Sequence, residues 1–134
     1  MLAFELLNAA GCLQKLGNAK EARRRMDRAQ DLAQDIEDAK LIASVLIQSA
    51  SLRSAQGDLR DAEGDARKAV EVAGTEGLRR ELANAHYLLG DILGKRNQET
   101  AARESFERAL RLFRRLKDEG MARRLGAEIQ NLKR

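Results

Sequence analysis

The sequence predicts an all-helical fold built from repeated antiparallel helix pairs. Three observations predict it: proline is absent from all 134 residues, aromatic residues make up only 3% of the chain, and the residue pattern repeats after forty positions. A proline-free chain rich in alanine, leucine, arginine, glutamate and glutamine favours helices throughout. A chain of this length can bury a hydrophobic core without metals or disulfides.

The forty-residue repeat is visible as columns of small residues that coincide when the sequence is shifted by one period. Three columns hold only alanine: Ala3, Ala43 and Ala83; Ala22, Ala62 and Ala102; Ala29, Ala69 and Ala109. A fourth column, Ala10, Ala50 and Gly90, is expected to face the second. Small side chains let helix axes approach to the low end of the usual range of about 8–10 Å, so we expect these columns at helix crossings.

Turn signals divide each repeat into two helices. The turns inside the repeats are marked by Gly17-Asn18, Gly57-Asp58 and Asn97-Gln98, and those between repeats by Asp38, by the segment from Gly74 to Gly77 and by Gly120. Glycine and asparagine accept the left-handed conformation that closes a helix, and aspartate or asparagine can cap the next one.

Between these turns, apolar residues recur every three or four positions, which is the spacing of one helix face. The first helix carries Leu2, Leu6, Ala9, Leu13 and Leu16, and the fifth carries Leu82, Ala85, Leu89 and Leu93. We expect helices at 2–16, 19–38, 40–56, 59–74, 78–95, 99–117 and 121–133. Gly64, inside the fourth of these helices, indicates close packing or local softness.

The expected organisation is one repeat domain over residues 1–134, with repeats at about 1–40, 41–80 and 81–120 and a capping helix at 121–134. The last helix has a single apolar stripe and is otherwise polar, as the end of a repeat array requires. The first helix starts at once with apolar residues and has no capping box, so we expect the chain to be part of a larger protein.

Two repeats carry a recognisable family pattern. The third has Leu89-Gly90, Leu93, Ala102, Phe106 and Ala109, and the first has Leu6, Ala9-Ala10, Leu13, Ala22, Met26 and Ala29. This pattern resembles the tetratricopeptide repeat family, which implies an α-solenoid of stacked helix pairs in a right-handed superhelix. The second repeat departs from it at Ser49, Arg53 and Ala66, where the family prefers larger apolar residues. The period of forty exceeds the usual one of about thirty-four and is similar to that of bacterial signal-transducing ATPases and LuxR-type regulators.

The resemblance implies a scaffold that binds a peptide or helix of a partner protein in a groove lined by the first helices, in bacterial signalling or transcription regulation. The groove positions are Phe4, Leu7, Asn8, Ile47, Gln48, Ser51, Asn84, Tyr87, Leu88 and Asp91. A related subfamily begins a basic carboxylate clamp where Leu7, Ile47 and Tyr87 stand here, so an apolar strip favours an amphipathic helix or an extended peptide. Tyr87 is the expected anchor. The alternative is that Leu7 and Ile47 only pack between neighbouring first helices.

The net charge of +4 arises in the last part of the chain, where residues 81–134 hold twelve basic and eight acidic side chains. A basic stretch at 108–134 leaves a nucleic-acid contact open. It contains no aromatic residue apart from Phe113 and no DNA-reading motif, so a solvated helix face is the preferred interpretation. Homo-oligomerisation through the first helix is a further alternative.

No motif in the sequence predicts catalysis, a metal site or a cofactor. His86 shares its column with Leu6 and Leu46 and is expected to be packed. Cys12 shares its column with Leu52 and Ile92 and is expected to act as a small hydrophobe. Asp61 and Asp65 are expected on an exposed helix face without a cleft, which does not suit acid catalysis.

A cytoplasmic location is expected from three features of the sequence. The single cysteine excludes an internal disulfide and fits a reducing compartment. No apolar run approaches the roughly 20 residues that a membrane span needs. The N-terminus lacks the basic start and the cleavage site of a signal peptide.

Overall fold

A computed structural model describes residues 2–132, which form seven α-helices. In chain order they are α1 (Leu2–Lys15), α2 (Ala19–Ile36), α3 (Ala39–Ala55), α4 (Leu59–Glu76), α5 (Arg79–Lys95), α6 (Glu99–Arg115) and α7 (Glu119–Leu132). The predicted helices are confirmed, and their ends differ from the observed ones by at most two residues. Residue 133, where the last predicted helix ends, lies outside the described residues.

The turns between the helices recur every twenty residues, at half the repeat period. Each contains one residue with a positive φ: Gly17, Glu37, Gly57, Gly77, Asn97 and Lys117. In five of the six, the next N–H donates to the carbonyl five residues back, as from Asp58 to Arg53 at 2.9 Å, which is the Schellman closure. The predicted break at Gly120 is wrong, because the turn lies at Lys117 and the Asp118 carboxylate accepts from the Met121 N–H, which places Gly120 inside α7.

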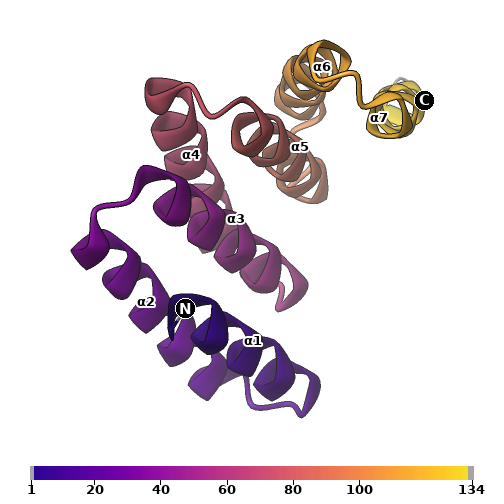
Figure 1. The fold of residues 1–134 in the computed structure, drawn as a ribbon. Coiled ribbons are helices and arrows are strands. Elements are labelled where there is room, and N and C mark those ends of the chain that lie inside the picture. Colours follow the sequence, from indigo (N-terminus) through magenta and orange to yellow (C-terminus); the bar gives the residue numbers. More distant parts are fainter. Residues whose placement is uncertain (1, 133–134) are drawn as a thin grey trace.

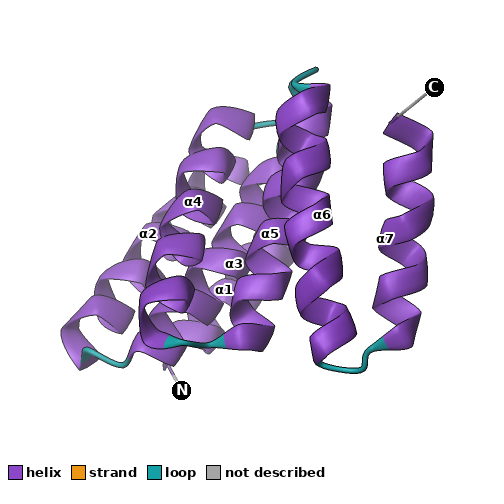
Figure 2. Cartoon of the chain, turned by 90° about the horizontal axis from the view of Figure 1, so that it is seen from above, coloured by secondary structure: helices purple, strands orange, loops and turns teal. Residues whose placement is uncertain are grey.

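The helices pack as antiparallel pairs, α1 with α2, α3 with α4 and α5 with α6, and α7 packs on α6. Figure 1 shows the odd-numbered helices in one row and the even-numbered helices in a second row, with the odd-numbered row on the inner side of the curve. Figure 2 shows α7 beside α6, joined to it by a short loop at one end. The predicted α-solenoid of three antiparallel pairs and a last helix is confirmed.

The predicted columns of small residues are buried. All nine alanines of the three columns are at most 2% exposed. Ala10, Ala50 and Gly90 are buried as well. At Gly90 the fit is closest, because a Cβ there would lie 2.7 Å from the ring of Phe106, one helical turn beyond the predicted contact Ala102.

Two single residues depart from the expectations. Gly64 is exposed and a Cβ there would meet nothing within 4 Å, so close packing, the first of its two predicted roles, is wrong. Cys12 is exposed, although Leu52 in the same column is half-buried and Ile92 is fully buried. This column faces the preceding first helix: a Cβ on Gly11 of α1 would lie 3.8 Å from the Leu52 side chain. Among the described residues no first helix precedes α1, so Cys12 stays uncovered.

Candidate protein-binding groove

All ten predicted groove residues lie on α1, α3 and α5, the helices of the inner row (Figure 1). Four are exposed: Asn8, Gln48, Ser51 and Asn84. Five are half-buried: Phe4, Ile47, Tyr87, Leu88 and Asp91. Leu7 is only 2% exposed and belongs to the core between α1, α2 and α3. The predicted positions therefore form a surface of polar side chains beside partly covered apolar ones.

Part of this surface is a hollow of about 470 Å³ between α1 and α3, which we call the groove hollow. It is lined by Leu7, Asn8, Gly11, Cys12, Lys15, Gln48, Ser51 and Leu52. Four of the ten predicted residues thus come together here, and its floor is apolar while its rim carries amides, a hydroxyl, a thiol and an ammonium group. Such a lining can take an apolar side chain and hydrogen-bond the backbone that bears it.

In the third repeat, the predicted groove residues contact neighbouring side chains. The Tyr87 ring packs edge-on against Phe106, with ring centres 5.9 Å apart and planes at 73°. Asp91 pairs with Lys95 at 3.4 Å, and the Lys95 ammonium also donates to the Ser54 hydroxyl at 3.1 Å. Tyr87, the expected anchor, is therefore half-buried against α6.

Between the first and second repeats lies a polar network of six side chains from α2, α3 and α4, with Ser49 and Asp65 buried and Asp27 and Asp61 exposed. They are Asp27, Gln30, Ser49, Arg53, Asp61 and Asp65. The guanidinium of Arg53 pairs with all three carboxylates, at 3.3 Å to Asp65 and 3.6 Å to Asp61. We call this set the Arg53 network.

The position of Asp65 corrects the prediction of an exposed acidic pair. Asp65 is 6% exposed, while Asp61 remains exposed. Its carboxylate accepts from the Ser49 hydroxyl at 2.9 Å and from the Gln30 amide at 3.1 Å. Burial raises the pKa of Asp65 above its ordinary value, and Arg53 acts in the opposite direction. The Asp65 carboxylate thus links α4 to α2 and α3.

The tetratricopeptide repeat family model matches residues 2–75 and 41–115. The chain belongs to the tetratricopeptide repeat family. Domains of this family typically act as protein–protein interaction modules and are usually non-catalytic. A comparison with curated proteins found no match.

Two solved tetratricopeptide-like structures show the same architecture. The crystal structure of BtubC (BKLC) from P. vanneervenii has a TM-score of 0.84 at 22% identity, over 92% of this chain and 51% of that chain. The N-terminal domain of stress-induced protein-1 (STI-1) from C. elegans has a TM-score of 0.74 at 19% identity, over 98% of this chain and 94% of that chain. The present chain therefore spans about half the length of BtubC. At these identities, the likeness shows the fold alone.

Two features of this tetratricopeptide array escape sequence reasoning. Asp65 lies three residues after Ala62 and four before Ala69, so its helical phase marks it as buried although its charge suggests exposure. Cys12 lines the groove hollow. Ile92, at the same position in the third repeat, is buried, whereas no described helix covers Cys12 on α1. His86 is 7% exposed, which confirms that it is packed; burial, together with Arg108, lowers its pKa below the ordinary value of 6.5.

Within residues 2–132, no three histidine, cysteine, aspartate or glutamate side chains are arranged to hold a metal ion. None of the seven described helices combines the length and the apolar character that crossing a membrane requires.

Proposed function

We propose that this tetratricopeptide repeat chain is a non-catalytic scaffold module that binds an extended peptide or an amphipathic helix of a partner protein. The groove hollow between α1 and α3 supports this proposal, because it combines an apolar floor with hydrogen-bonding groups from two helices. Its volume of about 470 Å³ is in the range of pockets that hold a ligand group of several side-chain atoms.

The two kinds of lining residue have separate roles in this proposal. Leu7 and Leu52 form the floor and receive one apolar side chain of the partner, whose burial contributes about 25 cal/mol per Å². Asn8 and Gln48 each carry a donor and an acceptor, so they pair with the N–H and C=O groups of the bound backbone. Lys15 at the rim favours an acidic residue of the partner next to the apolar one.

The cellular setting proposed for this module is bacterial signalling or transcription regulation in the cytoplasm. The forty-residue period and the segment from Phe106 to Gly120 support it, through their resemblance to bacterial signal-transducing ATPases and LuxR-type regulators. The single cysteine also fits a reducing compartment.

The proposal is tested by comparing two glutamine-to-arginine variants as baits in lysate of the source organism, with mass spectrometry of the captured proteins. Gln48→Arg places a long cation at the rim of the groove hollow, and Gln34→Arg places the same group on exposed α2. A groove partner is retained by wild type and by Gln34→Arg and is lost with Gln48→Arg. Equal recovery of every captured protein with both variants would overturn the proposal.

A further inference from the structure

The Arg53 network has a counterpart forty residues later, where the same positions hold different chemistry. Its members Asp27, Gln30, Ser49, Arg53, Asp61 and Asp65 correspond to Arg67, Val70, Leu89, Leu93, Ala101 and Ser105. We call the space between α2, α3 and α4 the first crevice and its counterpart between α4, α5 and α6 the second crevice. The Arg53 side chain fills the first crevice and is 11% exposed. In the second crevice that position holds Leu93, which is 1% exposed and belongs to the core.

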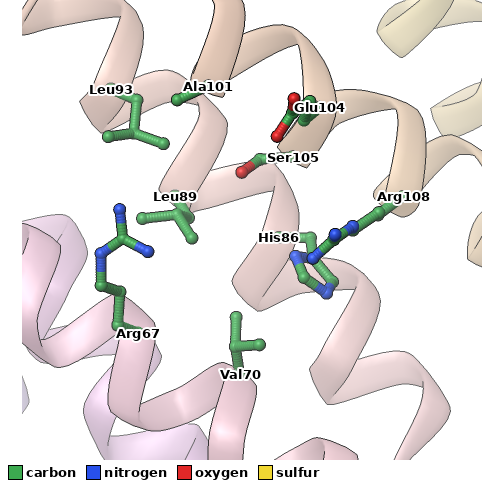
Figure 3. A pocket seen from close by; sticks show the side chains of 9 residues that line it. All are labelled: Arg67, Val70, His86, Leu89, Leu93, Ala101, Glu104, Ser105 and Arg108. Carbon is green, nitrogen blue, oxygen red and sulfur yellow. The ribbon is translucent and has the colours of Figure 1, made fainter. Parts of the chain in front are cut away.

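The second crevice is therefore open. The six counterpart residues, with His86, Glu104 and Arg108, line a hollow of about 250 Å³ between α4, α5 and α6 (Figure 3). Its floor is apolar, formed by Val70, Leu89 and Leu93, and Ser105 lies on its α6 side. The charge at one position is also opposite, because Arg67 of the second crevice corresponds to Asp27 of the first.

His86 lines this hollow and also a second one. The second hollow, also about 250 Å³, is lined by His86, Arg108, Arg111, Leu112 and Arg115 and by no carboxylate. Figure 3 shows the Arg108 guanidinium beside the imidazole of His86. His86 is only 7% exposed, and its Nδ1 atom is buried without a hydrogen-bond partner.

A buried ring nitrogen without a partner costs about 1–3 kcal/mol. Arginine guanidinium groups bind carboxylates in paired hydrogen bonds. The two hollows share His86 and Arg108, so a single bound group can meet the imidazole and the guanidinium together. The ring nitrogen of His86 thus lacks a hydrogen-bond partner beside the Arg108 guanidinium and an apolar floor. A negatively charged group placed there would accept hydrogen bonds from both side chains.

We propose that the α4–α6 crevice is a second docking site, which binds a peptide that carries an apolar residue followed by acidic residues. The apolar side chain lies against Leu89 and Leu93, and a carboxylate lies between His86 and Arg108. A nucleic acid fits less well, because its phosphate backbone offers no apolar group for the floor formed by Val70, Leu89 and Leu93. This site uses another face of α5 than the groove and does not rest on the groove proposal.

The charged groups around His86 set the pH dependence of this site. Arg108, Arg111 and Arg115 face it from α6, as does Glu104, while α4 contributes Arg67, which pairs with its own neighbour Glu63 at 2.9 Å. A bound carboxylate stabilises the protonated imidazole against these cations. Peptide binding therefore raises the pKa of His86, and lowering the pH toward that pKa strengthens binding.

The test measures the pKa of His86 by NMR, which is unambiguous because the chain has one histidine. The probe is an N-acetylated peptide of one leucine followed by three glutamates, and the control peptide has glutamines instead. The glutamate peptide should raise the pKa of His86 by about one pH unit, and the glutamine peptide should leave it unchanged. An unchanged pKa with the glutamate peptide would overturn the proposal.

Two arginine variants separate the site from general charge attraction. Arg108→Gln should weaken binding of the glutamate peptide by about tenfold, since it removes one charged hydrogen-bond donor. Arg114→Gln, an exposed residue of the same helix that lines neither hollow, should bind as wild type does. Equal weakening in both variants would contradict a defined site. A duplex DNA that shifts the pKa of His86 more than the glutamate peptide does would replace the proposed partner class.

Discussion

Replacing Gly90 by alanine tests the tightest helix crossing of the array. A Cβ at this position would lie 2.7, 2.8 and 3.0 Å from three atoms of the Phe106 ring. Phe106 is 3% exposed and belongs to the core cluster that extends from α3 to α7. Because a rigid ring in a filled core cannot turn away, α5 and α6 must separate to admit the methyl group.

The expected magnitude follows from two opposing effects. Overpacking of this kind costs about 1–3 kcal/mol. Alanine inside a helix is more favourable than glycine by about 1 kcal/mol. Gly90→Ala should therefore lower the free energy of unfolding by up to about 2 kcal/mol.

Gly94→Ala is the matched control, one turn later on the same helix. A Cβ at Gly94 would meet nothing within 4 Å, so only the gain of about 1 kcal/mol in helix propensity applies. The propensity gain cancels between the two variants, and their difference of about 1–3 kcal/mol is the cost of the crossing itself. Urea unfolding followed by circular dichroism gives both values. Equal stability of Gly90→Ala and Gly94→Ala would refute the packing at Gly90.

Three further predictions use the same unfolding assay. Arg53→Leu should lower the free energy of unfolding by about 3–5 kcal/mol, since it leaves Asp65 buried without its ion pair. Adding Asp65→Ser should recover most of that loss, because leucine and serine are the residues at these two positions in the third repeat. A double variant as unstable as the single one would count against the network. The pKa of His86 is lower in the folded chain than its ordinary value of 6.5. As the pH falls through 6.5, the unfolded chain therefore binds more protons than the folded chain, and the free energy of unfolding decreases. The free energy of unfolding of His86→Leu should therefore fall less than that of wild type between about pH 7.5 and about pH 5, whereas equal losses would exclude His86 as the group responsible. Lys117→Gly should add about 0.5–1 kcal/mol, because Lys117 has φ 59° and glycine accepts that conformation without strain; an unchanged midpoint would argue against strain at this turn.

The sequence predicts the helices well because their ends are encoded locally. Gly17, Gly57 and Asn97 are residue types that accept a positive φ, and each sits at the predicted turn. Glu37 and Lys117 adopt the same conformation but belong to types that rarely do so. The predicted ends of α2 and α6 consequently run two residues too long.

The candidate sites are predicted less completely, because they depend on which side chains meet across helices. The repeat register places Leu7, Asn8, Gln48 and Ser51 on the correct helices, and the structure shows that they share one hollow. The convergence of three carboxylates on Arg53 has no signature within any one helix, since its members come from α2, α3 and α4.

The Arg53 network also determines where the array is weakest. It lies between a core cluster that joins α1, α2 and α3 and another that extends from α3 to α7, and α2 contacts α3 less extensively than α4 contacts α5. Each unit of a repeat array is held only by its neighbours. The first helical hairpin should therefore detach as a separate cooperative unit, and its backbone amides should exchange hydrogen together before those of α4 to α6.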